Sequence, residues 1–129
     1  MKIRFLALIL LTATLQAGEP TEAELARLQH ALEEANSQAD MNMASRDLAE
    51  YWDRVLEREE TRVLAACDAD QAKLFQKAQK LWRAFRNAEV EFQGDSSRGG
   101  SIQPLIHNTT YAALTERRVK ELQSSSEMH

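Results

Sequence analysis

The scarcity of helix-breaking residues constrains this chain more than any other feature. Only four of its 129 residues are glycine and two are proline. Alanine, leucine, glutamate, glutamine, lysine and arginine dominate instead, and these residues lose little side-chain freedom in an α-helix. We therefore predict an all-α fold, a small antiparallel bundle of three to four helices. At 43% hydrophobic residues, the chain supports one modest core.

The first 17 residues have the pattern of a cleaved signal peptide. Lys2 and Arg4 supply a positive start, residues 5–15 are mostly apolar, and Ala17 is a small residue before the cleavage point. This apolar run is shorter than the roughly 20 residues that span a bilayer, and no second hydrophobic segment follows. We expect an exported protein, periplasmic or secreted, without stable membrane insertion, whose residues 18–129 form a single domain. The alternative is an N-terminal helix that is kept in the fold.

Removing that segment makes the chain more acidic. The whole chain has 16 basic and 20 acidic residues, and the loss of Lys2 and Arg4 leaves 14 basic residues and a net charge of −6. Nucleic acid is a poor partner for such a surface, because phosphate binding needs concentrated positive charge. A basic protein is a better one, since opposite charge steers encounter. The alternative is that the charge only keeps the domain soluble.

The first two predicted helices follow from a cap and from apolar periodicity. Thr21 and Glu24 have the spacing of a capping box, and Leu25, Leu28, Leu32 and Ala35 follow on one face. After a polar interval at 36–40, a second helix begins near Met41. Its expected inward residues are Leu48, Trp52, Val55, Glu59, Val63 and Ala66, and its charged face is expected to be solvated.

A wide apolar stripe marks the third predicted helix, which Asp68 or Asp70 caps and which ends near Gln93. We predict that this stripe makes it the central helix of the bundle. The stripe consists of Leu74, Phe75, Ala78, Leu81, Trp82, Phe85, Ala88 and Phe92. The opposite face carries Lys73, Lys77, Lys80, Arg83 and Asn87, either as a solvated face or as a contact for an anionic polymer.

One long flexible connection, Gly94 to Ser101, precedes the last predicted helix. Gly94 suits a helix end, Gly99 and Gly100 permit positive φ, and Ser101 can cap the next helix. That helix extends from about Ile102 to Ser124. Its expected core residues are Leu105, Ala112, Thr115, Val119 and Leu122.

Three segments in this half of the chain resemble the lysozyme inhibitor LprI N-terminal-like family of exported bacterial proteins. They are the Trp-bearing helix Ala78 to Glu89, the turn Gly99-Gly100-Ser101, and Leu114-Thr115-Glu116-Arg117-Arg118. The resemblance implies a small exported helical domain, and the family's name implies inhibition of lysozyme. Its motif positions fall on Gln79, Trp82, Arg86, Glu89, Gly99, Gly100, Ser101, Thr115 and Arg118. We expect Trp82 to be a core anchor, and Arg86, Glu89, Thr115 and Arg118 to join the last two helices.

Cysteine usage departs from what the resemblance implies. Related sequences carry cysteines where Met43, Val90 and Thr110 stand here, and the joint loss of the last two fits the loss of one disulfide. The single cysteine, Cys67, matches no family cysteine. It is expected to be a small buried residue, with an intermolecular disulfide as the alternative.

No pattern in the sequence points to catalysis, a metal or a cofactor. His30, His107 and His129 are isolated, and neither G-x-S-x-G nor H-E-x-x-H occurs. We therefore expect a protein that is not an enzyme. The first functional hypothesis is inhibition of lysozyme, or of another enzyme that degrades the cell wall, by protein binding through the Gly94 to Ser101 turn with Asp95 and Arg98 as contacts. The alternative is a structural or adaptor module of the bacterial envelope that binds through a helix face.

Overall fold

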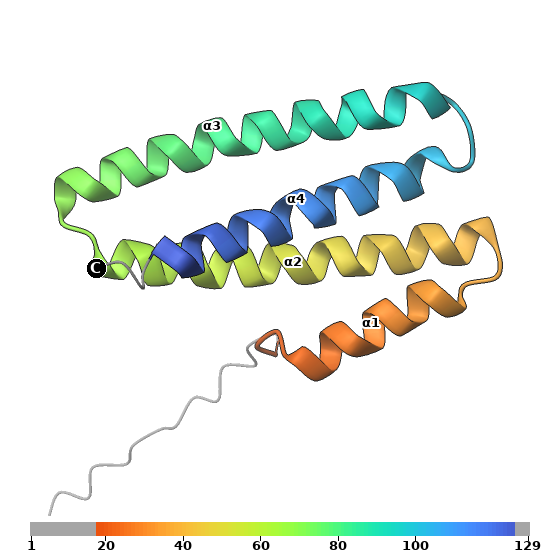
Figure 1. Cartoon of the computed structure of the whole chain (residues 1–129), viewed down its shortest axis with the longest axis horizontal. Helices are drawn as coiled ribbons and strands as arrows, with labels where there is room; N and C mark the ends of the chain where they lie inside the picture. Colours follow the sequence, from red (N-terminus) through yellow and green to blue (C-terminus); the bar gives the residue numbers. More distant parts are fainter. Residues whose placement is uncertain (1–17, 126–129) are drawn as a thin grey trace, which may run out of the picture.

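The computed structural model of this chain describes residues 18–125, and these residues form four α-helices (Figure 1). They are α1 (Glu22–Glu34), α2 (Gln38–Ala66), α3 (Ala69–Gly94) and α4 (Gln103–Ser125), with a 3₁₀ turn, η1 (Asp95–Ser97), after α3. Consecutive helices run antiparallel, and the described part of the chain contains no β-strand. The predicted all-α fold is confirmed. The predicted signal peptide, residues 1–17, lies outside the described residues.

Side-chain caps explain where the first three helices begin. The side-chain oxygens of Thr21, Ser37 and Asp68 each accept a hydrogen bond from the backbone amide three residues later. Such caps satisfy amides that the first turn of a helix leaves unpaired. The complete capping box is at α3, where Gln71 bonds back to the Asp68 amide. At α1 the Glu24 carboxylate instead forms an ion pair with Arg54 of α2.

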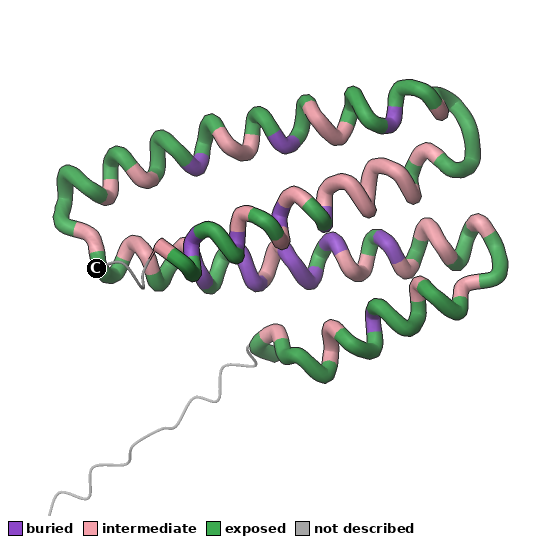
Figure 2. The backbone as a smooth tube through the Cα atoms, viewed as in Figure 1, coloured by how far each residue is buried: buried purple, intermediate pink, exposed green. Residues whose placement is uncertain are grey.

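Helix α2 is the centre of the fold. It contacts α1 on one side and α4 on another, and α2 and α4 run in the same direction (Figure 1). Buried residues concentrate on these two helices, whereas α3 is exposed along most of its length (Figure 2). The apolar core consists of Leu28, Ala49, Tyr51, Trp52, Val55, Leu56, Ala112, Val119 and Leu122.

The predicted place of α3 is therefore wrong. Instead of being central, α3 lies on the outside of the bundle and packs mainly on α4. Most of its predicted apolar stripe faces solvent, with Leu74 69%, Leu81 62%, Phe85 55% and Phe92 72% exposed. The buried residues of α3 are Gln79, Arg86 and Gly94. The helix docks through these buried polar side chains, whose partners lie on α2 and α4, and through Phe75 and Trp82, which are half-buried against the core.

Polar contacts attach α1 to α2. The Tyr51 hydroxyl donates to the Thr21 carbonyl at 3.2 Å, and Arg54 reaches the Gly18 carbonyl at 3.3 Å as well as Glu24. Arg58 donates to the Pro20 carbonyl at 3.3 Å. These bonds hold the segment before α1 against the middle of α2, while Leu28 packs into the core.

A close backbone approach fixes the end of α3 against α4. A Cβ atom placed on Gly94 would lie 2.1 Å from Nε2 of His107, so any larger residue requires the ring or the helix to shift. The chain then turns through η1, and Gly99 adopts a φ of 75°, which glycine permits without strain. None of the helices between residues 18 and 125 is both long and apolar enough to cross a membrane.

Candidate functional site

A buried polar cluster centred on Arg86 joins α3 to α2 and α4. Arg86 is only 5% exposed, and its Nη1 donates to Thr115 Oγ1 at 3.2 Å and lies 3.3 Å from Asp53 Oδ1. Its guanidinium carbon is 4.9 Å from the centroid of the Trp82 ring and 3.9 Å from that of Tyr111. The cation is thus stabilised by one carboxylate and two aromatic rings.

Tyr111 completes the cluster from α4. Its hydroxyl lies 2.8 Å from Asp53 Oδ1 and 2.7 Å from Oδ2, so it donates to this carboxylate. Burial, the hydrogen bond to Asp53 and the negative charge of Asp53 together raise the pKa of Tyr111 to about 12. Thr115, fully buried, donates to the Tyr111 carbonyl at 2.7 Å while it accepts from Arg86. Asp53 of α2 therefore binds Arg86 of α3 and Tyr111 of α4.

A second polar contact between α3 and α4 lies about two helical turns from the first. Arg118 Nε donates to Gln79 Oε1 at 2.7 Å, and Gln79 is 2% exposed. Gln79 Nε2 and Arg86 Nε are buried and find no hydrogen-bond acceptor among the described residues. This contact is therefore polar and incompletely paired, unlike the apolar contact between α2 and α4.

The structure places the predicted motif residues in three different settings. Arg86 and Thr115 bond to each other, Trp82 lies half-buried against Arg86, and Arg118 bonds to Gln79. Glu89 lies apart from this cluster, because it accepts a hydrogen bond from Gln93 of its own helix at 2.8 Å. The proposed role of these positions in joining the last two helices stays a prediction.

Sequence reasoning missed two members of the cluster, Asp53 and Tyr111. Asp53 sits among many charges on α2, so nothing in its neighbourhood marks it out. Tyr111 stands one turn before Thr115, and this spacing places both on one face of α4. That spacing was the available signal.

Glu59 of α2 is a buried carboxylate that was predicted to face inward, and it does so. Glu59 accepts from Arg62 Nε at 2.6 Å and from Gln123 at 3.2 Å, and Arg62 also donates to the Leu122 carbonyl at 3.1 Å. Burial acts to raise the pKa of Glu59, but the hydrogen bonds from Arg62 and Gln123 outweigh it and hold the pKa below its usual 4.5. Glu59 and Arg62 therefore connect the later part of α2 to the end of α4.

The predicted contact segment, Gly94 to Ser101, lies at one end of the bundle (Figure 1). Gly94 is buried as the last residue of α3 and Ser97 is half-buried, whereas the other residues of the segment are exposed. Asp95 and Arg98 form an ion pair with each other, and both are exposed. The Gly100 amide donates to the Ser97 carbonyl, and the Asn42 amide group donates to the Ser101 carbonyl at 3.1 Å. The turn is therefore anchored to the start of α2.

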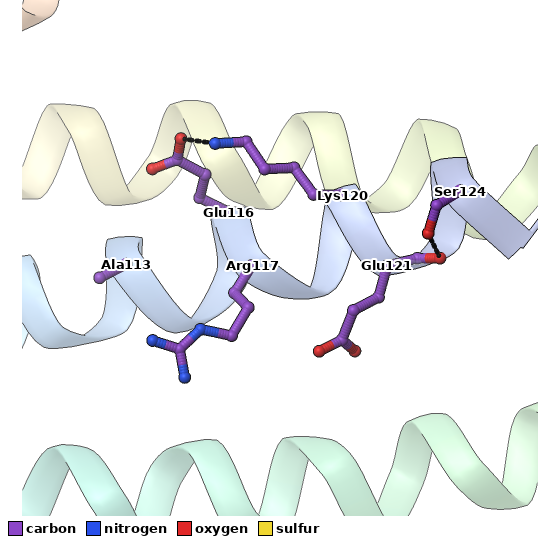
Figure 3. A pocket seen from close by; sticks show the side chains of 6 residues that line it. All are labelled: Ala113, Glu116, Arg117, Lys120, Glu121 and Ser124. Atoms are coloured by element: carbon purple, nitrogen blue, oxygen red, sulfur yellow. Dashed lines mark hydrogen bonds and ion pairs between the residues drawn. The ribbon is translucent and has the colours of Figure 1, made fainter.

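A shallow hollow along α4 is lined by charged side chains, among which Glu116 and Lys120 form an ion pair at 2.7 Å (Figure 3). Within residues 18–125 no group of three or more His, Cys, Asp or Glu side chains could hold a metal ion. Cys67 is a free, half-buried cysteine at the turn between α2 and α3.

Comparison with known proteins places the chain in a family. The lysozyme inhibitor LprI family matches residues 29–122, which span every part of the helical bundle described above except the start of α1 and the end of α4. An uncharacterized protein of Rhizobium meliloti (strain 1021) is 29% identical over 106 residues, which cover 72% of this chain and 76% of that protein. No solved structure matches significantly. The chain belongs to the lysozyme inhibitor LprI family.

Proposed function

We propose that this protein is an exported inhibitor of lysozyme or of a related enzyme that degrades the cell wall, and that it acts by protein binding without catalysis. Membership of the LprI family is the observation that carries this proposal. The excess of acidic residues supports it, because a negative surface attracts a basic enzyme and speeds encounter.

The turn between α3 and α4 is the proposed contact with the enzyme. It lies at one end of the bundle, and the exposed apolar side chain of Ile102 follows it directly. Met43 of α2 is a further exposed apolar residue. Met43 follows Asn42, which bonds to the turn. Apolar anchors beside charged groups are typical of protein interfaces. Asp95 and Arg98 can exchange their mutual ion pair for contacts with the enzyme at little cost, because exposed pairs contribute little stability.

A lysis assay tests the inhibition. Protein expressed from residues 1–129 is titrated into a suspension of bacterial cells treated with lysozyme, and turbidity is followed. We expect lysis to slow as the protein approaches the concentration of the enzyme. Full lysis at a large molar excess over lysozymes of several classes would exclude this function.

A matched pair of variants tests the contact segment. The variant Asp95→Ala/Arg98→Ala removes the ion pair of the turn, and Glu116→Ala/Lys120→Ala removes an equivalent pair from α4. We expect the first variant to weaken inhibition by about 10-fold or more, as for two interface side chains, and the second to inhibit normally. Equal inhibition by both variants would place the contact elsewhere.

Export is proposed from the sequence of residues 1–17. Expression of residues 1–129 in a bacterial host should yield protein outside the cytoplasm, and its measured mass should equal that of a chain that begins at Gly18. Uncleaved protein retained in the cytoplasm would contradict it.

The alternative function, an adaptor of the envelope, is favoured by the exposed apolar face of α3. An adaptor would capture an envelope protein through this face, and its binding would survive scrambling of residues 94–101. Loss of all binding on scrambling would argue for the turn instead.

A further inference from the structure

The outer face of α3 carries a continuous row of exposed apolar side chains, which we call the α3 seam. Its large members, Leu74, Leu81, Phe85 and Phe92, are between 55% and 72% exposed. Two exposed alanines fill the intervals. The complete α3 seam is Leu74, Ala78, Leu81, Phe85, Ala88 and Phe92.

The spacing of the α3 seam is that of a helix that packs along another helix. Its members are separated alternately by four and three residues, which is the seam of a coiled coil. Arg86 and Gln79, which dock α3 onto α4, are buried, whereas every member of the seam is exposed. A second helix can therefore cover the seam without any rearrangement of the bundle.

The exposed area is large for a protein of this size. A phenylalanine buries about 150 to 250 Å² when it is fully covered, so two phenylalanines and two leucines at this exposure offer about 500 Å². Soluble monomers rarely expose a larger apolar patch than this. Specific interfaces bury at least about 600 Å² on each partner, and the seam with the stems of its flanking side chains reaches that value.

We propose that the α3 seam binds the same seam of a second copy of this chain, with the two α3 helices antiparallel. This arrangement places Phe92 against Leu74 of the second copy, Phe85 against its Leu81, and Ala88 against its Ala78. Each layer with a phenylalanine then holds a leucine, so the two helices keep an even separation. A parallel pair would instead place both phenylalanine layers at one end and both leucine layers at the other.

Charge selects the same orientation. The first half of α3 is net basic, with Lys73, Lys77 and Lys80 against Asp70. In the second half Arg83 pairs with Glu60 of α2 and Arg86 is buried, so Glu89 and Glu91 are the charges left to a partner. In the antiparallel pair, Lys77 flanks the seam opposite Glu91 of the second copy, and symmetry repeats this contact. In a parallel pair the basic halves would face each other, which is unfavourable.

The oligomeric state tests the seam. The purified protein is studied by sedimentation equilibrium at about 10 to 100 μM, a range suited to the affinity of a small interface. We expect the mass of a dimer. The variant Leu81→Glu/Phe85→Glu places charges at the centre of the seam and should weaken association at least about 100-fold. Its matched control is Met43→Glu, which adds a charge at an apolar side chain that is equally exposed but lies on α2.

Because all these positions are exposed, the variants should keep the helical circular dichroism and melting temperature of the parent. A monomeric parent protein would overturn the proposal, as would a dimer that Leu81→Glu/Phe85→Glu leaves intact. Neither result depends on whether lysozyme is inhibited.

Charge exchange tests the orientation. Lys77→Glu and Glu91→Lys should each weaken the dimer by about 5-fold, because each places like charges together at two symmetry-related sites. The double variant restores opposite charges and should associate like the parent. A double variant that is weaker than either single variant would overturn the antiparallel arrangement, since these two positions are far apart in a parallel pair.

Discussion

The guanidinium carbon of Arg86 lies 3.9 Å from the centroid of the Tyr111 ring. Helices α3 and α4 thus meet around a cation and an aromatic ring, and the apolar face of α3 is left free. The carboxylate of Asp53 neutralises this cation and also accepts from the Tyr111 hydroxyl. Removing any member of this group should therefore affect the attachment of α3 more than the core between α2 and α4.

Arg86→Ala should lower the melting temperature. The change removes the bonds to Thr115 and Asp53 and leaves a cavity between two aromatic rings. We expect the free energy of unfolding to fall by about 2 kcal/mol and the melting temperature by roughly 10 °C. The loss is smaller than for a fully buried ion pair because Asp53 is partly exposed. Arg117→Ala, at an exposed arginine of α4, is the control and should change stability by less than about 0.5 kcal/mol. Equal melting of the two variants would show that the cluster contributes nothing.

Gly94→Ala should destabilise the protein, although alanine normally stabilises a helix relative to glycine. The added methyl group would lie 2.1 Å from the His107 ring, so the ring or the helix must move, at a cost of about 1 to 3 kcal/mol. In a His107→Ala background the same change should be neutral or stabilising. Chemical denaturation of the four proteins measures this coupling. Additive effects would contradict the close contact.

The two tyrosines should separate in an alkaline titration. The pKa of Tyr111 is raised to about 12 from its usual 10.0, so the folded protein holds this proton more tightly than the unfolded chain does. The resulting stability is complete below pH 10 and is lost as the pH rises through about 12. Burial raises the pKa of Tyr51 as well, although less than that of Tyr111. In absorbance of tyrosinate at 295 nm, the titration step near pH 12 should therefore be present in the parent and in Tyr51→Phe but absent from Tyr111→Phe. A step near pH 12 that persists in Tyr111→Phe would contradict the assignment.

Glu59 should control part of the acid sensitivity. Its pKa in the folded protein is below the usual 4.5, so its contribution to stability is complete above that pH and is lost as the pH falls through the folded value. Glu59→Gln should therefore destabilise the protein at neutral pH and lose less further stability on acidification. Thermal melts between pH 7 and 3 measure both effects. Glu57→Gln, at an exposed glutamate of α2, should follow the parent at every pH.

Much of the fold could be predicted from local sequence, because helix limits depend on neighbouring residues. Thr21 and Asp68 cap helices as their side chains indicate, and the last helix begins and ends within one residue of the prediction. Its core positions were also correct at Ala112, Thr115, Val119 and Leu122, since the apolar face of α4 does point inward.

The orientation of α3 could not be predicted in this way. Its apolar periodicity favours burial of Leu81 and Phe85. The face with Arg86 is buried instead, because it meets Asp53 and Tyr111, which lie far from α3 in the sequence. Amphipathicity identifies two faces of a helix and assumes that the apolar one is inside. Here the polar face finds an ion pair and hydrogen bonds, and the assumption fails.

The turn between α3 and α4 lies at one end of the bundle, whereas α4 finishes at Ser125 at the opposite end (Figure 1). A tag or a surface anchor fused behind α4 therefore leaves the turn pointing away from the support. Immobilising the protein in this way presents residues 94–101 to an enzyme in solution, and attachment through a cysteine placed in the turn would hide them.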